Sequence, residues 1–64
     1  MASGKYIAFA IDISGAAVGR YELAAEDEVR AIEEARRHLR DHPVIEVWDG
    51  GFRRVARLKD SDSE

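Results

Sequence analysis

Apolar and polar side chains alternate at the start of the chain, over about residues 5–13, which is typical of a β-strand with one buried face. After a turn at Ser14 and Gly15, a second run over about residues 17–24 predicts a strand that returns beside the first. Together the two strands predict an antiparallel hairpin. One face of the first strand carries the large residues Ile7, Phe9, Ile11 and Ile13.

After this hairpin the apolar positions recur every three or four residues, which predicts an amphipathic helix over about residues 27–41. Asp27 is the expected N-cap, because its carboxylate can accept a hydrogen bond from the first helical turn. Pro43 disfavours the helical conformation at His42, so the helix is expected to end before it. The expected apolar stripe consists of Val29, Ile32, Ala35 and Leu39, flanked by Ala25, Ala31 and His38.

Two further apolar runs, over about residues 44–48 and 52–58, predict a second hairpin. A three-residue loop of Asp49, Gly50 and Gly51 would place Gly51 in the left-handed conformation that such loops require. The resulting register pairs Trp48 with Phe52, Glu46 with Arg54, Val44 with Ala56 and Ile45 with Val55.

The order of these elements predicts an α+β domain with ββαββ topology. It would be a four-stranded antiparallel sheet built from two hairpins, with the amphipathic helix packed on one face. We expect a single domain over residues 1–59, followed by an acidic and disordered tail over residues 60–64.

The composition of the 64 residues, 45% apolar and 36% charged, fits a globular domain with a charged surface. Three of the thirteen acidic residues lie in the tail, so the remaining ten balance the ten basic residues. A neutral domain has no general electrostatic attraction to nucleic acid or anionic lipid. The core of so short a chain is thin, and no cysteine is present to reinforce it with a disulfide, so oligomerisation is favoured.

The absence of cysteine also fits a reducing compartment. The apolar run at residues 6–11 is too short for the core of a signal peptide or for a membrane span. We therefore expect a cytoplasmic protein that does not enter a membrane.

One helix covers only one face of a four-stranded sheet, so apolar side chains on the other face need a partner. The first strand would turn its large residues toward the helix, and the second hairpin would keep apolar side chains on both faces. A homodimer through the helix-free face or an edge strand is the expected form, and a protein or peptide partner is the alternative occupant. The expected interaction surface comprises Tyr6, Ala8, Ala10, Val44, Trp48, Phe52, Ala56 and Leu58.

Patterns for catalysis or metal binding are weak. His38 and His42 have a spacing at which two imidazoles can share a metal, but a third ligand is missing. Histidines near the end of a helix also interact favourably with its dipole. The acidic pairs lie on an exposed helix beside arginines, and the serines lie in a turn or near the termini, so no nucleophile or general acid is indicated. We expect no enzymatic activity, no cofactor and no metal.

Arg53, Arg54 and Arg57 are the strongest candidates for recognition, because sheets that bind single-stranded RNA combine basic with aromatic side chains. Three expectations argue against nucleic acid: the pairing of Arg54 with Glu46, the packing of Trp48 on Phe52, and the neutral charge of the domain. Because the arginines lie beside aromatic residues, a small nucleic-acid-binding protein that uses the second hairpin is nevertheless the alternative function.

The segment AIEEARRHLRDHPVIEVWDGGFRRV, residues 31–55, resembles the second half of several small bacterial domains of unknown function. In these domains a hairpin precedes a helix of the form AIxxAR, and a strand with an Asp-Gly turn follows. Some of these families carry a glycine-aspartate turn early in the chain, where this chain has Ile13, Ser14 and Gly15. The resemblance implies a bacterial ββαββ domain without catalytic residues.

Overall fold

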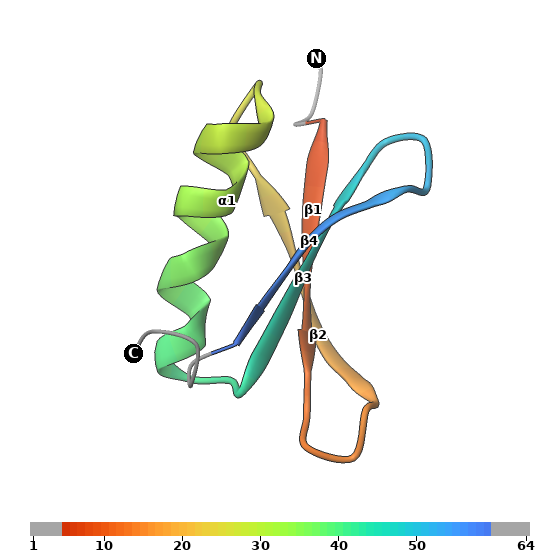
Figure 1. Cartoon of the computed structure of the whole chain (residues 1–64), viewed down its shortest axis with the longest axis vertical. Coiled ribbons are helices and arrows are strands. Elements are labelled where there is room, and N and C mark those ends of the chain that lie inside the picture. Colours follow the sequence, from red (N-terminus) through yellow and green to blue (C-terminus); the bar gives the residue numbers. More distant parts are fainter. Residues whose placement is uncertain (1–4, 60–64) are drawn as a thin grey trace.

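The computed structural model describes residues 5–59, which form one four-stranded sheet and one helical segment (Figure 1). The α+β class and the ββαββ topology predicted from the sequence are confirmed. The predicted tail at residues 60–64 lies outside the described residues. In chain order the elements are β1 (Tyr6–Ile11), β2 (Ala17–Leu23), α1 (Glu28–Arg36), the 3-10 helix η1 (Arg37–Arg40), β3 (Val44–Asp49) and β4 (Arg54–Lys59).

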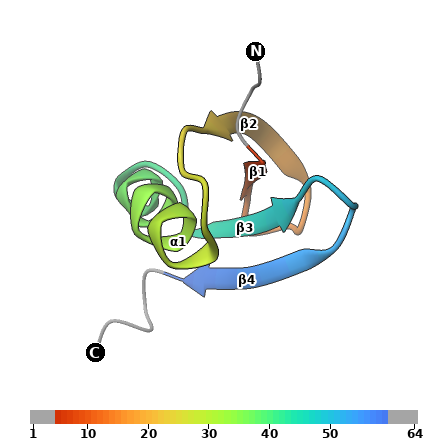
Figure 2. The ribbon, with the colours of Figure 1, turned by 90° about the horizontal axis from the view of Figure 1, so that it is seen from above.

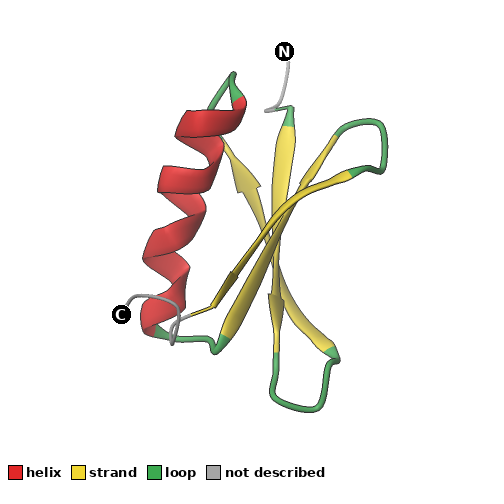
Figure 3. Cartoon of the chain, in the orientation of Figure 1, coloured by secondary structure: helices red, strands yellow, loops and turns green. Residues whose placement is uncertain are grey.

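The sheet is antiparallel with the order β2-β1-β3-β4, so β1 and β3 are central strands and β2 and β4 are edge strands. α1 and η1 run along one face of it, and the strands twist strongly past one another (Figure 3). Figure 2 shows the same helix end-on, on one side of the sheet. Within residues 5–59 no second helix covers the opposite face, and no helix is long and apolar enough to cross a membrane.

The helix begins where the sequence predicts. The Oδ1 atom of Asp27 accepts a hydrogen bond from the backbone N–H of Arg30 at 2.8 Å, which is the geometry of an N-cap. The 3-10 turn η1 continues α1 to Arg40, and His42 and Pro43 lie beyond it. The predicted N-cap and the predicted break before Pro43 are both confirmed.

Small side chains fill much of the space between the helix and the sheet. The largest fully buried side chains are Leu23, Ile45 and Val47. The other members of the buried cluster are Ala8, Ala10, Ala25, Ala31 and Ala35. Because an alanine on the sheet and an alanine on the helix occupy little depth, the helix can approach the central strand closely.

The expected orientation of β1 was wrong. Ala8 and Ala10 are fully buried beneath the helix. Strand geometry then places Ile7, Phe9 and Ile11 on the opposite face. Alternation in the sequence shows that the two faces differ, but it does not show which face the helix covers.

The helix is also rotated relative to the predicted stripe. Ala31 and Ala35 are fully buried, whereas Val29 is 67% exposed. Ile32 and Leu39 lie between these extremes. The physical reason is the same as for β1, since the alanines of the helix fit against the alanines of the central strand.

The predicted register of the second hairpin was also wrong, because its loop begins one residue later than expected. The backbone N–H of Asp49 donates to the carbonyl of Arg53 at 2.9 Å, and that of Phe52 donates to the carbonyl of Asp49 at 3.3 Å. The loop is therefore Gly50, Gly51 and Phe52, with the positive φ of 63° at Phe52 rather than at Gly51. The observed pairs are Trp48 with Arg54, Val47 with Ala56, Glu46 with Arg57, Ile45 with Leu58 and Val44 with Lys59.

The side chain of Asp49 explains the position of this loop. Its Oδ1 atom accepts hydrogen bonds from the backbone N–H groups of Gly51 at 2.9 Å and Arg53 at 3.1 Å. An aspartate that bonds to the backbone two residues ahead stabilises a turn that starts at the aspartate itself. Asp49 is therefore the last residue of β3 rather than the first residue of the loop.

The first hairpin turns in the same way. The backbone N–H of Asp12 donates to the carbonyl of Ala16, and that of Gly15 donates to the carbonyl of Asp12, both at 2.9 Å. The Oδ1 atom of Asp12 accepts from the backbone N–H groups of Ser14 at 2.9 Å and Ala16 at 3.0 Å. Gly15, with a φ of 93°, occupies the position that Phe52 takes in the second turn.

The strands beyond the two turns are equivalent as well. Each hairpin has a β-bulge at the same distance from its aspartate, with Val18 unpaired in β2 and Val55 unpaired in β4. The sheet is thus built from two copies of one structural unit. The residue in the left-handed position is the main difference between their turns.

Candidate functional site

The face of the sheet opposite the helix, called the open face below, carries large apolar side chains along its centre and charged side chains along its edges. Residues that pair across antiparallel strands share a face, so the observed register assigns its members. The central strands contribute Ile7, Phe9, Ile11, Val44, Glu46 and Trp48, and the edge strands contribute Ala17, Arg20, Glu22, Arg54, Arg57 and Lys59.

A hollow of about 310 Å³ lies on the open face. The rings of Phe9 and Trp48 meet edge to face in it, with their centroids 6.3 Å apart and their planes at 89°. Such a pair stabilises the position of both rings, and both side chains are partly buried. The lining residues are Phe9, Ile11, Ala17, Glu46, Trp48 and Phe52.

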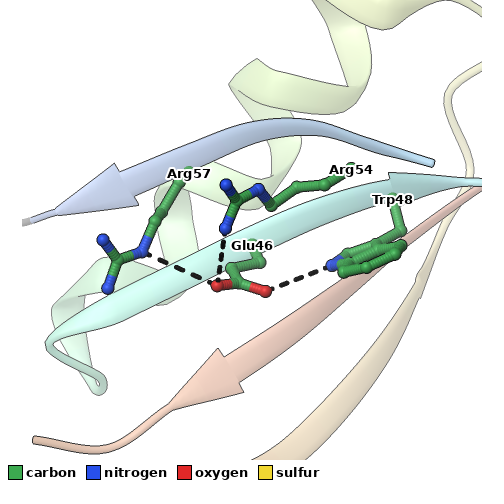
Figure 4. A network of polar contacts seen from close by, with 4 residues as sticks. All are labelled: Glu46, Trp48, Arg54 and Arg57. Atoms are coloured by element: carbon green, nitrogen blue, oxygen red, sulfur yellow. Dashed lines mark hydrogen bonds and ion pairs between the residues drawn. The ribbon is translucent and has the colours of Figure 1, made fainter. Parts of the chain in front are cut away.

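Glu46 is the polar centre of the open face, and its side chain is only 17% exposed. Its Oε1 atom accepts a hydrogen bond from Nε1 of Trp48 at 3.2 Å. Its Oε2 atom lies 3.3 Å from Nη1 of Arg54 and 3.6 Å from Nε of Arg57. Figure 4 shows both guanidinium groups and the indole turned toward this carboxylate. Glu46 therefore fixes the indole ring and partly neutralises two arginines.

The β-bulge in β4 makes this arrangement possible. Arg54 and Arg57 are an odd number of residues apart, so a regular strand would point them to opposite faces. The unpaired Val55 lies between them and packs against the core. The extra residue brings both arginines to the same face.

The structure does not bring together the eight residues predicted as an interaction surface. Five of them face the helix, where Ala8 and Ala10 are fully buried and Tyr6, Ala56 and Leu58 pack against the core. The other three, Val44, Trp48 and Phe52, belong to the open face or to its hollow. The predicted surface thus mixed two faces, because the orientation of β1 and the register of β4 were both misassigned.

The large residues of β1, Ile7, Phe9 and Ile11, were not predicted to lie on the open face. The spacing of alanines in the sequence could have indicated it. Alanines stand at alternate positions of the first strand and one helical turn apart at Ala31 and Ala35. Two small surfaces of this kind can pack more closely than a small surface and a large one.

The arginines of the alternative function lie in two places. Arg54 and Arg57 reach the open face beside Trp48, and the predicted ion pair between Arg54 and Glu46 is confirmed. Arg53 lies in the turn and is exposed. Both arginines on the face have a carboxylate partner within 4 Å.

On the helix side, Tyr21 of β2 contacts both histidines. Its ring stacks on that of His38 with centroids 3.8 Å apart, and its hydroxyl lies 2.9 Å from Nε2 of His42. Among residues 5–59 there is no group of three or more histidine, cysteine, aspartate or glutamate side chains that could hold a metal ion. The contacts of Tyr21 instead join an edge strand to the end of the helix.

A hollow of about 440 Å³ lies beside the start of the helix, between Ala24, Ala25 and the charged side chains of α1. The carboxylate oxygens of Glu34 accept from the backbone N–H of Ala24 at 3.2 and 3.3 Å. The charged side chains of its lining, Arg30, Glu33, Glu34 and Arg37, have both signs. This hollow has no excess of either charge to attract a ligand.

Comparison of the chain with protein-family models, with curated proteins and with solved structures found no match in any of the three. The resemblance to small bacterial ββαββ domains stays a prediction. Function therefore has to be inferred from the chemistry of the open face.

Proposed function

We propose that this domain is a non-catalytic protein-interaction module that self-associates through the open face. The observation that supports the proposal is the distribution of side-chain size. Five alanines share the cluster beneath the helix with Leu23, Ile45 and Val47, while Ile7, Phe9 and Trp48 lie on the face that no helix covers within residues 5–59. These three side chains are partly buried, and covering their remaining exposed surface stabilises an assembly in proportion to the apolar area removed from water.

The thin core supports a second copy as the partner. Within residues 5–59, three side chains larger than alanine are fully buried, which is a small core. Chains of this size that lack disulfides often gain stability by oligomerisation. Dimerisation through the open face would join two thin cores into a thicker layered structure.

The edge strands are a less suitable route to association. β4 presents Arg54, Arg57 and Lys59 along its length, and all three are exposed. Charged residues and bulges on an edge strand oppose pairing with a strand of another chain. β2 likewise carries the exposed Arg20 and Glu22 and a bulge at Val18, so the open face rather than either edge is the proposed interface.

We also propose a cytoplasmic location for this module. The support is the absence of cysteine, since chains in reducing compartments do not rely on disulfides. A cell-fractionation experiment with an antibody to the protein tests this point.

The experiment that tests self-association is light scattering across a concentration series, for the wild type, Trp48→Glu and Val29→Glu. Trp48 lies on the open face, and Val29 is an apolar residue of the helix that is 67% exposed. We expect a wild-type dimer, a folded monomer for Trp48→Glu by circular dichroism, and a dimer for the matched control Val29→Glu. A wild type that is monomeric at every concentration contradicts the proposal.

A further inference from the structure

Phe52 stands at the position that the first hairpin gives to glycine. In both turns the aspartate, Asp12 or Asp49, makes equivalent hydrogen bonds with the backbone of the turn. Each turn also has one residue with positive φ. In the first turn that residue is Gly15, and in the second it is Phe52, at φ 93° and 63° respectively. Within residues 5–59, Phe52 is the one residue other than glycine that has a positive φ.

This conformation is unfavourable for phenylalanine, because a Cβ atom clashes with the backbone there and the side chain has no polar group to compensate. Contacts within the chain offset little of this cost, since Phe52 is 89% exposed. A strained residue with an exposed aromatic ring is expected where the ring has a binding role.

The position of the ring indicates what it binds. Phe52 lies at the border of the hollow on the open face, together with Phe9, Ile11 and Trp48. A cavity of about 150 Å³ can hold a benzene ring, and this hollow measures about 310 Å³. The same face thus carries a protruding ring and a hollow of sufficient size for one.

We infer that Phe52 is the anchor of self-association and that the ring of each copy enters the hollow of the other. The inference rests on the proposed self-association and names the residue that drives it. A protruding group and its receptor on one surface are self-complementary, which is what a two-fold symmetric interface requires. Aromatic residues that fill a pocket near the centre of an interface commonly dominate its affinity.

The charges around the hollow favour a second copy over a nucleic acid. Arg54 and Arg57 lie 3.3 and 3.6 Å from Glu46, and Arg20 lies 3.8 Å from Glu22. Binding to phosphates requires arginines that can leave their carboxylate partners. Three of the four basic side chains of the open face are thus held by carboxylates of the same chain, which lowers both their attraction to phosphates and the repulsion between two copies.

The test compares the dimer dissociation constants of the wild type, Phe52→Gly and Ile13→Gly by sedimentation equilibrium. Ile13 is the matched control, because it lies in the other turn, is also 89% exposed and does not line the hollow. We expect Phe52→Gly to raise the dissociation constant at least tenfold and Ile13→Gly to change it less than twofold. At concentrations where both proteins are monomers, Phe52→Gly should unfold at a higher temperature than the wild type, because glycine relieves the strain.

The outcomes separate the two proposals. A Phe52→Gly dimer as tight as that of the wild type overturns the role of Phe52 and leaves self-association in place. A wild type that stays monomeric overturns both. Retention of the monomeric wild type on single-stranded DNA, lost in Phe52→Gly, would assign the ring to nucleic acid and overturn the second copy as the partner.

Discussion

The carboxylates of Asp12 and Asp49 accept equivalent backbone hydrogen bonds, and these bonds set the left-handed position of each turn. Glycine is the usual residue in that position, so the sequence predicts Gly51 there in the second turn. The carboxylate of Asp49 instead bonds to Gly51 and Arg53 and moves the left-handed position to Phe52. The left-handed conformation of Phe52 costs the monomer about 1–3 kcal/mol. The local sequence does not predict it, because a glycine stands directly beside Phe52.

Asp12 also makes the first turn sensitive to acid. The hydroxyl of Ser14 donates to its Oδ1 atom at 2.6 Å, and the backbone N–H of Ala16 donates to the same atom. The Ser14 hydroxyl first, and then the Ala16 backbone, hold the pKa of the Asp12 carboxyl below its usual value of 3.8. A carboxyl whose pKa is lower in the folded state than in the unfolded state stabilises the fold above the unfolded pKa, and the effect is lost as the pH falls through the folded pKa.

We therefore expect Asp12→Asn to be less stable than the wild type at pH 7, with a difference that shrinks as the pH falls below about 4. Asparagine keeps an oxygen in the same place, so the difference reports the charge rather than the shape of the turn. Urea denaturation of both proteins at pH 7 and pH 3 measures it. An equal difference at the two pH values would show that the charge of Asp12 does not stabilise the turn.

At the scale of elements, hydrophobic periodicity was sufficient to predict each strand, the helix and their order. It was not sufficient to orient β1 or α1. The strand has one face of large residues and one that carries Ala8 and Ala10, and either could have met the helix. Which face of β1 meets the helix depends on how well the two surfaces fit. The two alanines of the strand fit against Ala31 and Ala35 of the helix.

Substitutions in the helix test this packing. Ala35→Leu places extra atoms where the helix meets the sheet, and we expect it to lower the free energy of unfolding by about 1–3 kcal/mol. Val29→Ala removes an exposed side chain and should change it by less than about 0.5 kcal/mol. Chemical denaturation of both variants measures these effects. A larger loss for Val29→Ala than for Ala35→Leu would support the stripe expected from the sequence and contradict the structure.

At the scale of the whole molecule, large apolar side chains lie on both faces of the sheet, although within residues 5–59 a helix covers only one of them. Much of the interface between helix and sheet is alanine, and the aromatic rings of Phe9, Trp48 and Phe52 surround a hollow on the other side. The sequence predicts that apolar residues remain after one face is covered, but the register and the bulge that gather them with Glu46 come only from the three-dimensional structure. These large side chains on the open face are the main reason to expect a second copy there.

The fluorescence of Trp48 tests this claim most directly, because it is the one tryptophan of the chain and lies on the open face. We would measure quenching by acrylamide over a series of protein concentrations that spans the monomer and the dimer. We predict that acrylamide quenching of wild-type Trp48 falls as the protein concentration rises. In Phe52→Gly it should fall only at higher protein concentrations, because the dimer is weaker. Quenching that is equal at every concentration, while light scattering shows a dimer, would place the interface elsewhere on the molecule.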